Sequence, residues 1–66
     1  PNDILTSTVI KAGIEQTIRA YEPRAKDITI DVIPSQDDQY LVINIVFYVI
    51  NKIEAIDLTL NLKRVR

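Results

Sequence analysis

The sequence predicts an α+β domain in which one N-terminal helix packs on a three-stranded antiparallel sheet, in the order αβββ. Apolar residues recur at three- and four-residue steps before Pro23 and alternate in steps of two after it. Two short polar segments, 35–39 and 51–54, divide the alternating part into three strands. The chain of 66 residues is predicted to form a single domain, 1–66, and with no Cys and one Gly it depends on apolar packing for stability.

The helical pattern covers residues 4–21. Its apolar stripe consists of Ile10, Ile14, Ile18 and Tyr21, and charged side chains fall on other positions, which is typical of an amphipathic helix. Pro23 disfavours helical dihedral angles at the residue before it, so the helix should end near Tyr21. Gly13 costs about 1 kcal/mol relative to Ala in a helix, and we interpret it as a place where the helix closely approaches the sheet.

Three strands are predicted after Pro23, at residues 28–34, 40–50 and 57–63. Strands joined by short turns are normally antiparallel neighbours, so the second strand should be central, with one face beneath the helix. The third strand should direct three leucines into the same core. These are Leu58, Leu60 and Leu62, and they alternate with the outward residues Thr59, Asn61 and Lys63.

The second strand is apolar on both faces, although a single helix covers only one of them. The uncovered face would expose Tyr40, Val42, Val46, Tyr48 and Ile50. A contiguous patch of this kind is larger than monomeric proteins usually expose. We therefore expect it to be covered by a missing N-terminal segment, by a second copy of the chain or by a different protein, and we expect the isolated chain to self-associate or to be poorly stable.

The composition excludes most kinds of enzyme. With no His and no Cys, the chain lacks the commonest general base, cysteine nucleophiles and the usual transition-metal ligands, so we predict no cofactor and no metal. The net charge of −1 argues against a main role in neutralising nucleic-acid phosphates. No apolar stretch approaches the ~20 residues that cross a bilayer, so a soluble, cytoplasmic chain without membrane association is expected.

The αβββ order also resembles part of a double-stranded RNA-binding domain, and the chain ends in the basic segment Lys63-Arg64-Val65-Arg66. The acidic balance of the remaining residues disfavours this RNA-binding alternative. We interpret the basic segment either as a solvated end that protects the edge of the last strand or as a contact with an acidic neighbour.

Charge is concentrated between the helix and the first strand, in Tyr21-Glu22-Pro23-Arg24. Pro23 fixes the backbone there, so the Glu22 carboxylate and the Arg24 guanidinium would point in defined directions, and Arg suits bidentate contacts with a partner. The alternative is a local role, in which the two side chains form a surface salt bridge or cap the helix end, worth about 0–1 kcal/mol.

The segment from Ile18 to Arg24, followed by a strand, an acidic turn, a long apolar strand and a Leu-alternating strand, resembles the C-terminal half of the contractile-tail baseplate wedge family. This family includes sheath-initiator subunits of contractile phages and their counterparts in type VI secretion systems. Its Glu-Pro-Arg triplet is matched by Glu22, Pro23 and Arg24, whereas Ala25 stands where a bulky aliphatic residue is often found. Because family members are considerably longer, the resemblance implies that the chain is the C-terminal portion of a wedge subunit.

The resemblance implies a structural baseplate subunit that is assembled in the cytoplasm and lies in the tail baseplate of a phage or an equivalent contractile particle. It also implies that Glu22, Pro23 and Arg24 bind other wedge subunits. An open sheet edge suits the addition of a strand from another chain, and we expect sheath protein to bind at the last strand. That edge strand consists of Leu58, Thr59, Leu60, Asn61, Leu62 and Lys63.

The same family has carried a lysozyme-like label, and glycoside hydrolysis needs only two carboxylates. The candidate acids are Glu22, Asp27, Asp31, Asp37 and Asp38. A general acid has to be protonated before it acts, whereas Glu22 lies next to Arg24 and near Lys26, which favour its ionised form. A domain of this size also has little room for a sugar-binding cleft, so we predict that the chain is not an enzyme.

Overall fold

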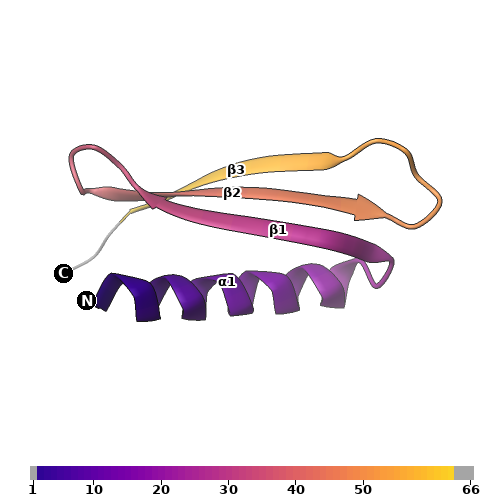
Figure 1. The fold of residues 1–66 in the computed structure, drawn as a ribbon, viewed down its shortest axis with the longest axis horizontal. Helices are drawn as coiled ribbons and strands as arrows, with labels where there is room; N and C mark the ends of the chain where they lie inside the picture. Colours follow the sequence, from indigo (N-terminus) through magenta and orange to yellow (C-terminus); the bar gives the residue numbers. More distant parts are fainter. Residues whose placement is uncertain (1, 64–66) are drawn as a thin grey trace.

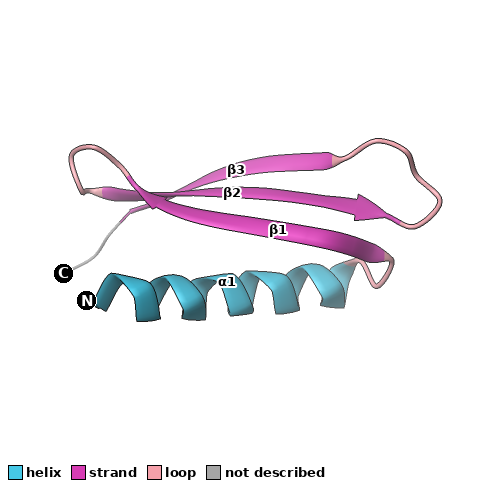
Figure 2. Ribbon diagram, in the orientation of Figure 1, coloured by secondary structure: helices cyan, strands magenta, loops and turns pink. Residues whose placement is uncertain are grey.

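The computed structural model describes residues 2–63, with side chains from Leu5 onward, and confirms the αβββ fold. The helix α1 (Asn2–Tyr21) is followed by the strands β1 (Ala25–Pro34), β2 (Tyr40–Val49) and β3 (Ile56–Lys63). The strands form one antiparallel sheet in the order β1-β2-β3, as Figure 1 and Figure 2 show. Arg64 and Arg66 of the basic segment lie outside the described residues.

The helix ends where the sequence predicts. The Glu22 N–H donates to the Ile18 C=O at 2.7 Å, and the chain then leaves the helix at Pro23. Tyr21 is 88% exposed, so it does not belong to the buried stripe. The side chains that pack on the sheet are Ile10, Ile14 and Ile18.

A β-bulge interrupts the pairing of β1 with β2. Lys26 pairs with Tyr48 and Thr29 pairs with Val46, so two residues of β1, Asp27 and Ile28, lie opposite one residue of β2. The backbone of Asp27 is left-handed, with φ of 53°, which Asp tolerates better than most residues. The bulge explains why simple alternation placed the start of this strand three residues too late.

The buried core is small and lies on the helix side of the sheet. It consists of Ala25, Ile30, Ile43, Ile45 and Phe47, against which the α1 isoleucines pack. Ala25 is only 5% exposed because the bulge turns it to the same face as Ile30, although their spacing would otherwise put them on opposite faces. The radius of gyration is 13.0 Å, above the about 11 Å typical of a compact chain of this length, so the molecule is elongated.

The helix lies nearest to β1 (Figure 1), and its isoleucines pack against the buried inner faces of both β1 and the central strand β2, as the sequence predicts for β2. The leucines of β3 face the helix side but are not covered, since Leu58, Leu60 and Leu62 are 46–48% exposed. The prediction that they lie in the core is therefore wrong. A helix is about 10 Å across, so a helix that lies nearest to β1 covers β1 and β2, which are about 4.8 Å apart, and leaves β3 uncovered.

An open groove of about 520 Å³ lies between the helix and β3, and we call it the α1–β3 groove. Its lining residues are Ile10, Gly13, Ile14, Thr17, Ile18, Ile45 and Leu60. No atom lies within 4 Å of the position that a Cβ on Gly13 would occupy, apart from its own helix backbone and chain neighbours. The prediction that Gly13 marks a close approach of the helix to the sheet is therefore wrong.

The apolar face of β2 that turns away from the helix also lies where the sequence places it. This far-face patch consists of Tyr40, Val42, Val46, Tyr48 and Ile50. Tyr40 and Ile50 are exposed at its two ends, and the three residues between them are half-buried. Polar side chains of the outer strands flank the patch, and Thr59 donates a hydrogen bond to Asn44 Oδ1 at 3.1 Å across it.

Candidate functional site

The Glu22-Pro23-Arg24 corner is a tight turn that joins the helix to the sheet. The Ala25 N–H donates to the Glu22 C=O at 2.9 Å, which closes a β-turn with Pro23 in its second position, where the fixed φ of proline fits best. The Ile50 N–H then donates to the Arg24 C=O at 3.0 Å, so the corner is tied to the end of β2. The backbone of the triplet is thus held at both sides.

The side chains of the corner do not pair with each other. The Glu22 carboxylate accepts a hydrogen bond of 3.4 Å from the backbone N–H of Arg24, and no ion pair joins the two side chains. Glu22 is half-buried, whereas Pro23 and Arg24 are exposed. Among residues 2–63 the Arg24 guanidinium has neither an ion pair nor a hydrogen bond. The local salt bridge considered from the sequence is therefore absent from the described residues.

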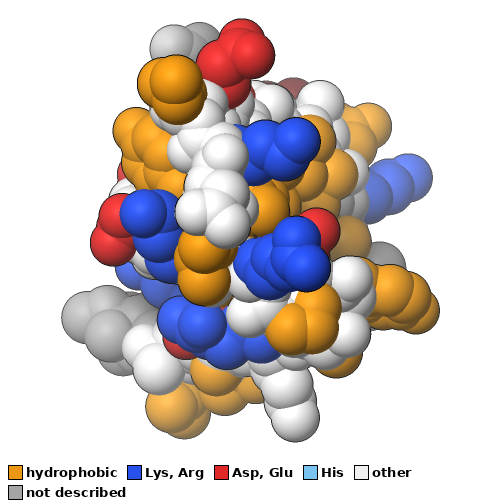
Figure 3. Space-filling model, turned by 90° about the vertical axis from the view of Figure 1, so that its right-hand side faces the viewer, with side chains coloured by type: hydrophobic (Ala, Val, Ile, Leu, Met, Phe, Trp, Pro, Cys, Tyr) orange, Lys and Arg blue, Asp and Glu red, His pale blue; other side chains and the backbone are white. Residues whose placement is uncertain are grey.

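A pocket of about 690 Å³ opens beside this corner. It is lined by Glu22, Val49, Ile56 and the β2–β3 loop from Asn51 to Ala55. Figure 3 looks at this end of the molecule and shows Lys and Arg side chains interspersed with hydrophobic ones over its surface. Ile53, in the loop, is 95% exposed. Sequence reasoning missed this loop, although an isoleucine within a polar turn was a signal that could have drawn attention to it.

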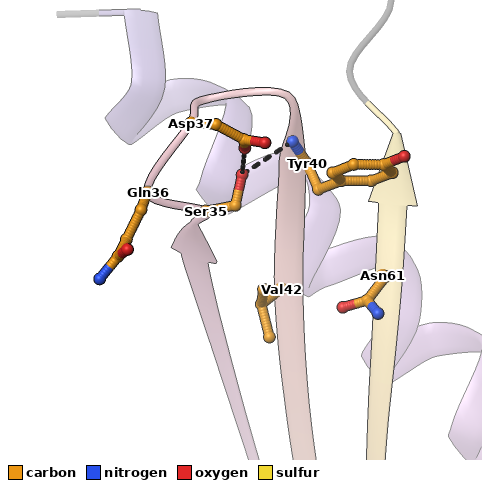
Figure 4. A pocket seen from close by; sticks show the side chains of 6 residues that line it. All are labelled: Ser35, Gln36, Asp37, Tyr40, Val42 and Asn61. Carbon is orange, nitrogen blue, oxygen red and sulfur yellow. Dashed lines mark hydrogen bonds between the residues drawn. The ribbon is translucent and has the colours of Figure 1, made fainter.

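A second pocket, of about 480 Å³, lies at the opposite end of the sheet (Figure 4). The β1–β2 turn on its wall is closed by Asp37, whose Oδ1 accepts hydrogen bonds from the Ser35 hydroxyl at 2.7 Å and the Gln39 N–H at 3.2 Å. The Ser35 hydroxyl oxygen in turn accepts the Tyr40 N–H at 3.0 Å. The bond from Ser35, and next the bond from Gln39, lower the pKa of Asp37 below its ordinary value. Asp37 is therefore a structural residue of the turn.

The carboxylates considered for glycoside hydrolysis are dispersed over the molecule. Glu22 and Asp27 lie near the start of β1, Asp31 pairs with Asn44 in its middle, and Asp37 and Asp38 lie in the β1–β2 turn. The second carboxylate in the pocket beside Glu22 belongs to Glu54, which sequence reasoning did not select. Within residues 2–63, no cluster of three or more acidic side chains is arranged to hold a metal ion.

The free edge of β3 is a regular ladder of backbone groups. Tyr40 C=O accepts from Ser35 and Ile50 N–H donates to Arg24, so the even-numbered residues of β2 point toward β1. The odd-numbered ones must then point toward β3, where they pair with Ile56, Leu58, Leu60 and Leu62. The remaining residues of β3 direct their N–H and C=O groups away from the sheet. These are Asp57, Thr59, Asn61 and Lys63.

The edge of β1 is different. By the same alternation Ile30, Val32 and Pro34 point away from β2, and proline has no N–H to donate. The bulge at Asp27 interrupts the ladder further along, and α1 lies beside the strand. Bulges, prolines and covering elements are the usual means of protecting a sheet edge. In the described part of the chain, the β3 edge is therefore the more regular and less protected of the two.

The fold and its surface define a small α+β domain with an exposed corner and an open strand edge. Comparison with known proteins adds a sequence similarity. The chain is 41% identical over 53 residues to baseplate wedge protein gp25 of Enterobacteria phage T4, a match that covers 80% of this chain and 40% of that protein. This similarity supports the assignment of the chain to the baseplate wedge family. The chain spans about two fifths of the length of that relative.

Neither the protein-family models nor the solved structures give a significant match. The helix of the described part of the chain is not long and apolar enough to cross a membrane.

Proposed function

We propose that this chain is a structural component of the baseplate of a contractile particle. The observation that carries the proposal is the 41% identity to a baseplate wedge protein over four fifths of the chain. The chain would be assembled in the cytoplasm and reside in the tail baseplate of a phage or an equivalent particle, with no cofactor and no role for nucleic acid or membrane.

The corner is proposed to bind neighbouring wedge subunits. Its backbone is tied to both the helix and β2, so a partner meets a preformed surface and loses little free energy to ordering it. The unpaired Arg24 guanidinium suits bidentate binding of a carboxylate, and Glu22 keeps an oxygen for a cationic or N–H donor. The pocket beside Glu22 supplies apolar contact area in the same place.

The edge of β3 is proposed to accept a strand of sheath protein. Four residues offer outward N–H and C=O groups at regular spacing, and the half-exposed leucines between them offer a row of apolar contacts on one face. Backbone hydrogen bonds of this kind give affinity, and the alternating side chains give register. On this proposal the sheet serves as the template on which sheath assembly starts.

The corner is tested by Glu22→Ala and Arg24→Ala. We expect both variants to keep the fold, because both side chains lie outside the core, and to abolish assembly of baseplate particles seen by electron microscopy. Lys11→Ala, an exposed charge on the helix, is the matched control and should assemble normally. Loss of more than about 2 kcal/mol of unfolding free energy in either corner variant would show a structural role and contradict the proposal.

The edge is tested by Thr59→Pro and Asn61→Pro. Each removes one outward N–H while leaving the pairing with β2 intact, so circular dichroism should show a folded domain. Sheaths on baseplates that carry either variant should be absent or short, whereas Thr59→Ala, which keeps the N–H, should give sheaths of normal length. Normal sheaths on a folded proline variant would exclude this edge.

The lysozyme-like alternative is tested by following the turbidity of a cell-wall suspension. We expect no loss of turbidity with the purified chain. Reproducible lysis that disappears in Glu22→Gln would establish a catalytic carboxylate and overturn the purely structural role.

A further inference from the structure

The β3 strand carries two kinds of unsatisfied surface that run side by side. Its outward N–H and C=O groups belong to Asp57, Thr59, Asn61 and Lys63, and its leucines are about half exposed on the helix side. Within residues 2–63, β2 is the one element whose backbone lies beside β3. An open, regular edge with a hydrophobic face is a surface that natural proteins normally cover or charge to prevent unintended pairing.

The order of side chains along β3 is complementary to itself when two copies run antiparallel. If Leu60 of one copy lies opposite Leu60 of another, Asp57 lies opposite Lys63 of the second copy and Thr59 lies opposite Asn61. Both ends of the strand then form an ion pair of opposite charges, and the middle pairs two uncharged polar residues. Leu58 lies opposite Leu62, so the leucines of both copies form one continuous row on the helix side.

The hydrogen-bonding phase of the edge is compatible with this register. Only pairings in which outward residue meets outward residue bring N–H groups to C=O groups, which requires odd-numbered positions to lie opposite each other. Centring the pairing on Leu60 satisfies this condition for all of the outward residues. Moving the centre by one residue in either direction keeps the phase but separates Asp57 from Lys63.

We propose that, in the absence of another strand, β3 pairs with β3 of a second copy of this chain, antiparallel about a two-fold axis at Leu60. The result is a continuous six-stranded sheet in which the two α1–β3 grooves adjoin. This inference goes beyond the proposed baseplate role, because it concerns the chain before any sheath protein is bound. The dimer protects the edge, and a sheath strand has to displace the second copy to use it.

The far-face patch is the competing surface for self-association. Its central residues Val42, Val46 and Tyr48 are already half-buried by their neighbours within the sheet, whereas the leucines of β3 remain nearly half exposed. The ionised side chains of β3 on this face, Asp57 opposite Val46 and Lys63 opposite Tyr40, are the same ones that pair in the antiparallel β3 register. The greater exposure of the β3 leucines and the complementary charges along one strand edge therefore favour β3.

Disulfide trapping tests the register directly, since the chain contains no Cys. Leu60→Cys places two thiols opposite each other across the axis and should form a disulfide-linked dimer under mild oxidation. Leu58→Cys is the matched control: its two thiols lie four residues apart along the ladder, about 13 Å, beyond the reach of a disulfide. A mixture of Leu58→Cys and Leu62→Cys should cross-link to each other. Equal cross-linking of Leu60→Cys and Leu58→Cys alone would overturn the register.

Charge exchange tests the interface in solution. Asp57→Lys and Lys63→Asp each replace two ion pairs of the dimer by like-charge contacts, and sedimentation should show dimerisation weakened about tenfold or more. The double variant restores opposite charges and should restore dimerisation. Circular dichroism checks the fold of each variant.

A chain that is strictly monomeric at high concentration overturns the proposal. So does self-association that survives both single charge changes and is lost in Tyr48→Lys, because that result places the contact on the far-face patch. Neither outcome bears on the baseplate role, whose tests are particle and sheath assembly.

Discussion

The two outer strands of the sheet have similar alternating sequences but opposite surroundings. β1 lies beside the helix, contributes Ala25 and Ile30 to the buried core, and has an edge broken by a bulge and a proline. β3 has the more regular alternation, yet every one of its residues is exposed. Alternation therefore predicts that a strand forms and which face each side chain takes. Whether that face is buried depends on what lies against it.

The sharpest test of this difference uses one cross-strand pair. Ile45 is 2% exposed, and its partner Leu58 in β3 is 46% exposed. Ile45→Ala should cost about 2–5 kcal/mol of unfolding free energy, because the shorter side chain leaves a cavity in the buried core. Leu58→Ala should cost about 1 kcal/mol, since half of the side chain is already in water. Urea unfolding of both variants measures the two values, and similar values would mean that something covers β3 in solution.

A substitution in the helix should change the unfolding free energy by a smaller amount and in the opposite direction. Gly13→Ala adds a methyl group that points into the open α1–β3 groove, where no atom lies within 4 Å. We expect a gain of about 1 kcal/mol from helix propensity alone. Ala12→Gly, at an exposed position one residue away, is the reciprocal control and should lose a similar amount. A loss of stability in Gly13→Ala would show that the groove is closed by a partner or by a tighter helix position.

The smallest expected effect is at the β1–β2 turn and depends on pH. The lowered pKa of Asp37 means that its hydrogen bonds stabilise the fold above the ordinary carboxyl pKa of 3.8, and that this contribution is lost as the pH falls through the lower folded-state pKa. Asp37→Asn should lower the unfolding free energy at neutral pH and make it depend less on pH in the acidic range. Unfolding curves at neutral and acidic pH, with Asp31→Asn as a control for an exposed carboxylate, measure the difference.

The sequence predicted the order of elements, the end of the helix at Pro23 and the apolar far face, because all three follow from local rules of periodicity and dihedral angles. It did not predict the bulge at Asp27. Asp27 and Ile28 together face one residue of β2, and such an extra residue in a strand cannot be recognised until the pairing with the partner strand is known. It also misplaced the leucines of β3, because the lateral position of a helix on a sheet depends on packing and not on either pattern.

The candidate site was predictable to a similar degree. The triplet Glu22-Pro23-Arg24 was recognisable from its residues, but the pocket beside it was not. That pocket forms because the β2–β3 loop, some thirty positions away in the chain, folds back beside Glu22. The exposed Ile53 within that loop becomes informative only when the corner is seen next to it.

The direction of the outward groups on β3 has a mechanical consequence. Hydrogen bonds from these groups to an added strand lie perpendicular to the strand axis. The molecule is elongated, 41 Å long and 19 Å wide. A strand pulled along its own axis loads all of these bonds in shear, so they must break together, whereas a strand pulled sideways from one end peels them apart one after another. An edge of this geometry resists a force along the strand and yields to a smaller force across it. The same row of hydrogen bonds can therefore hold an added strand strongly and still allow its removal.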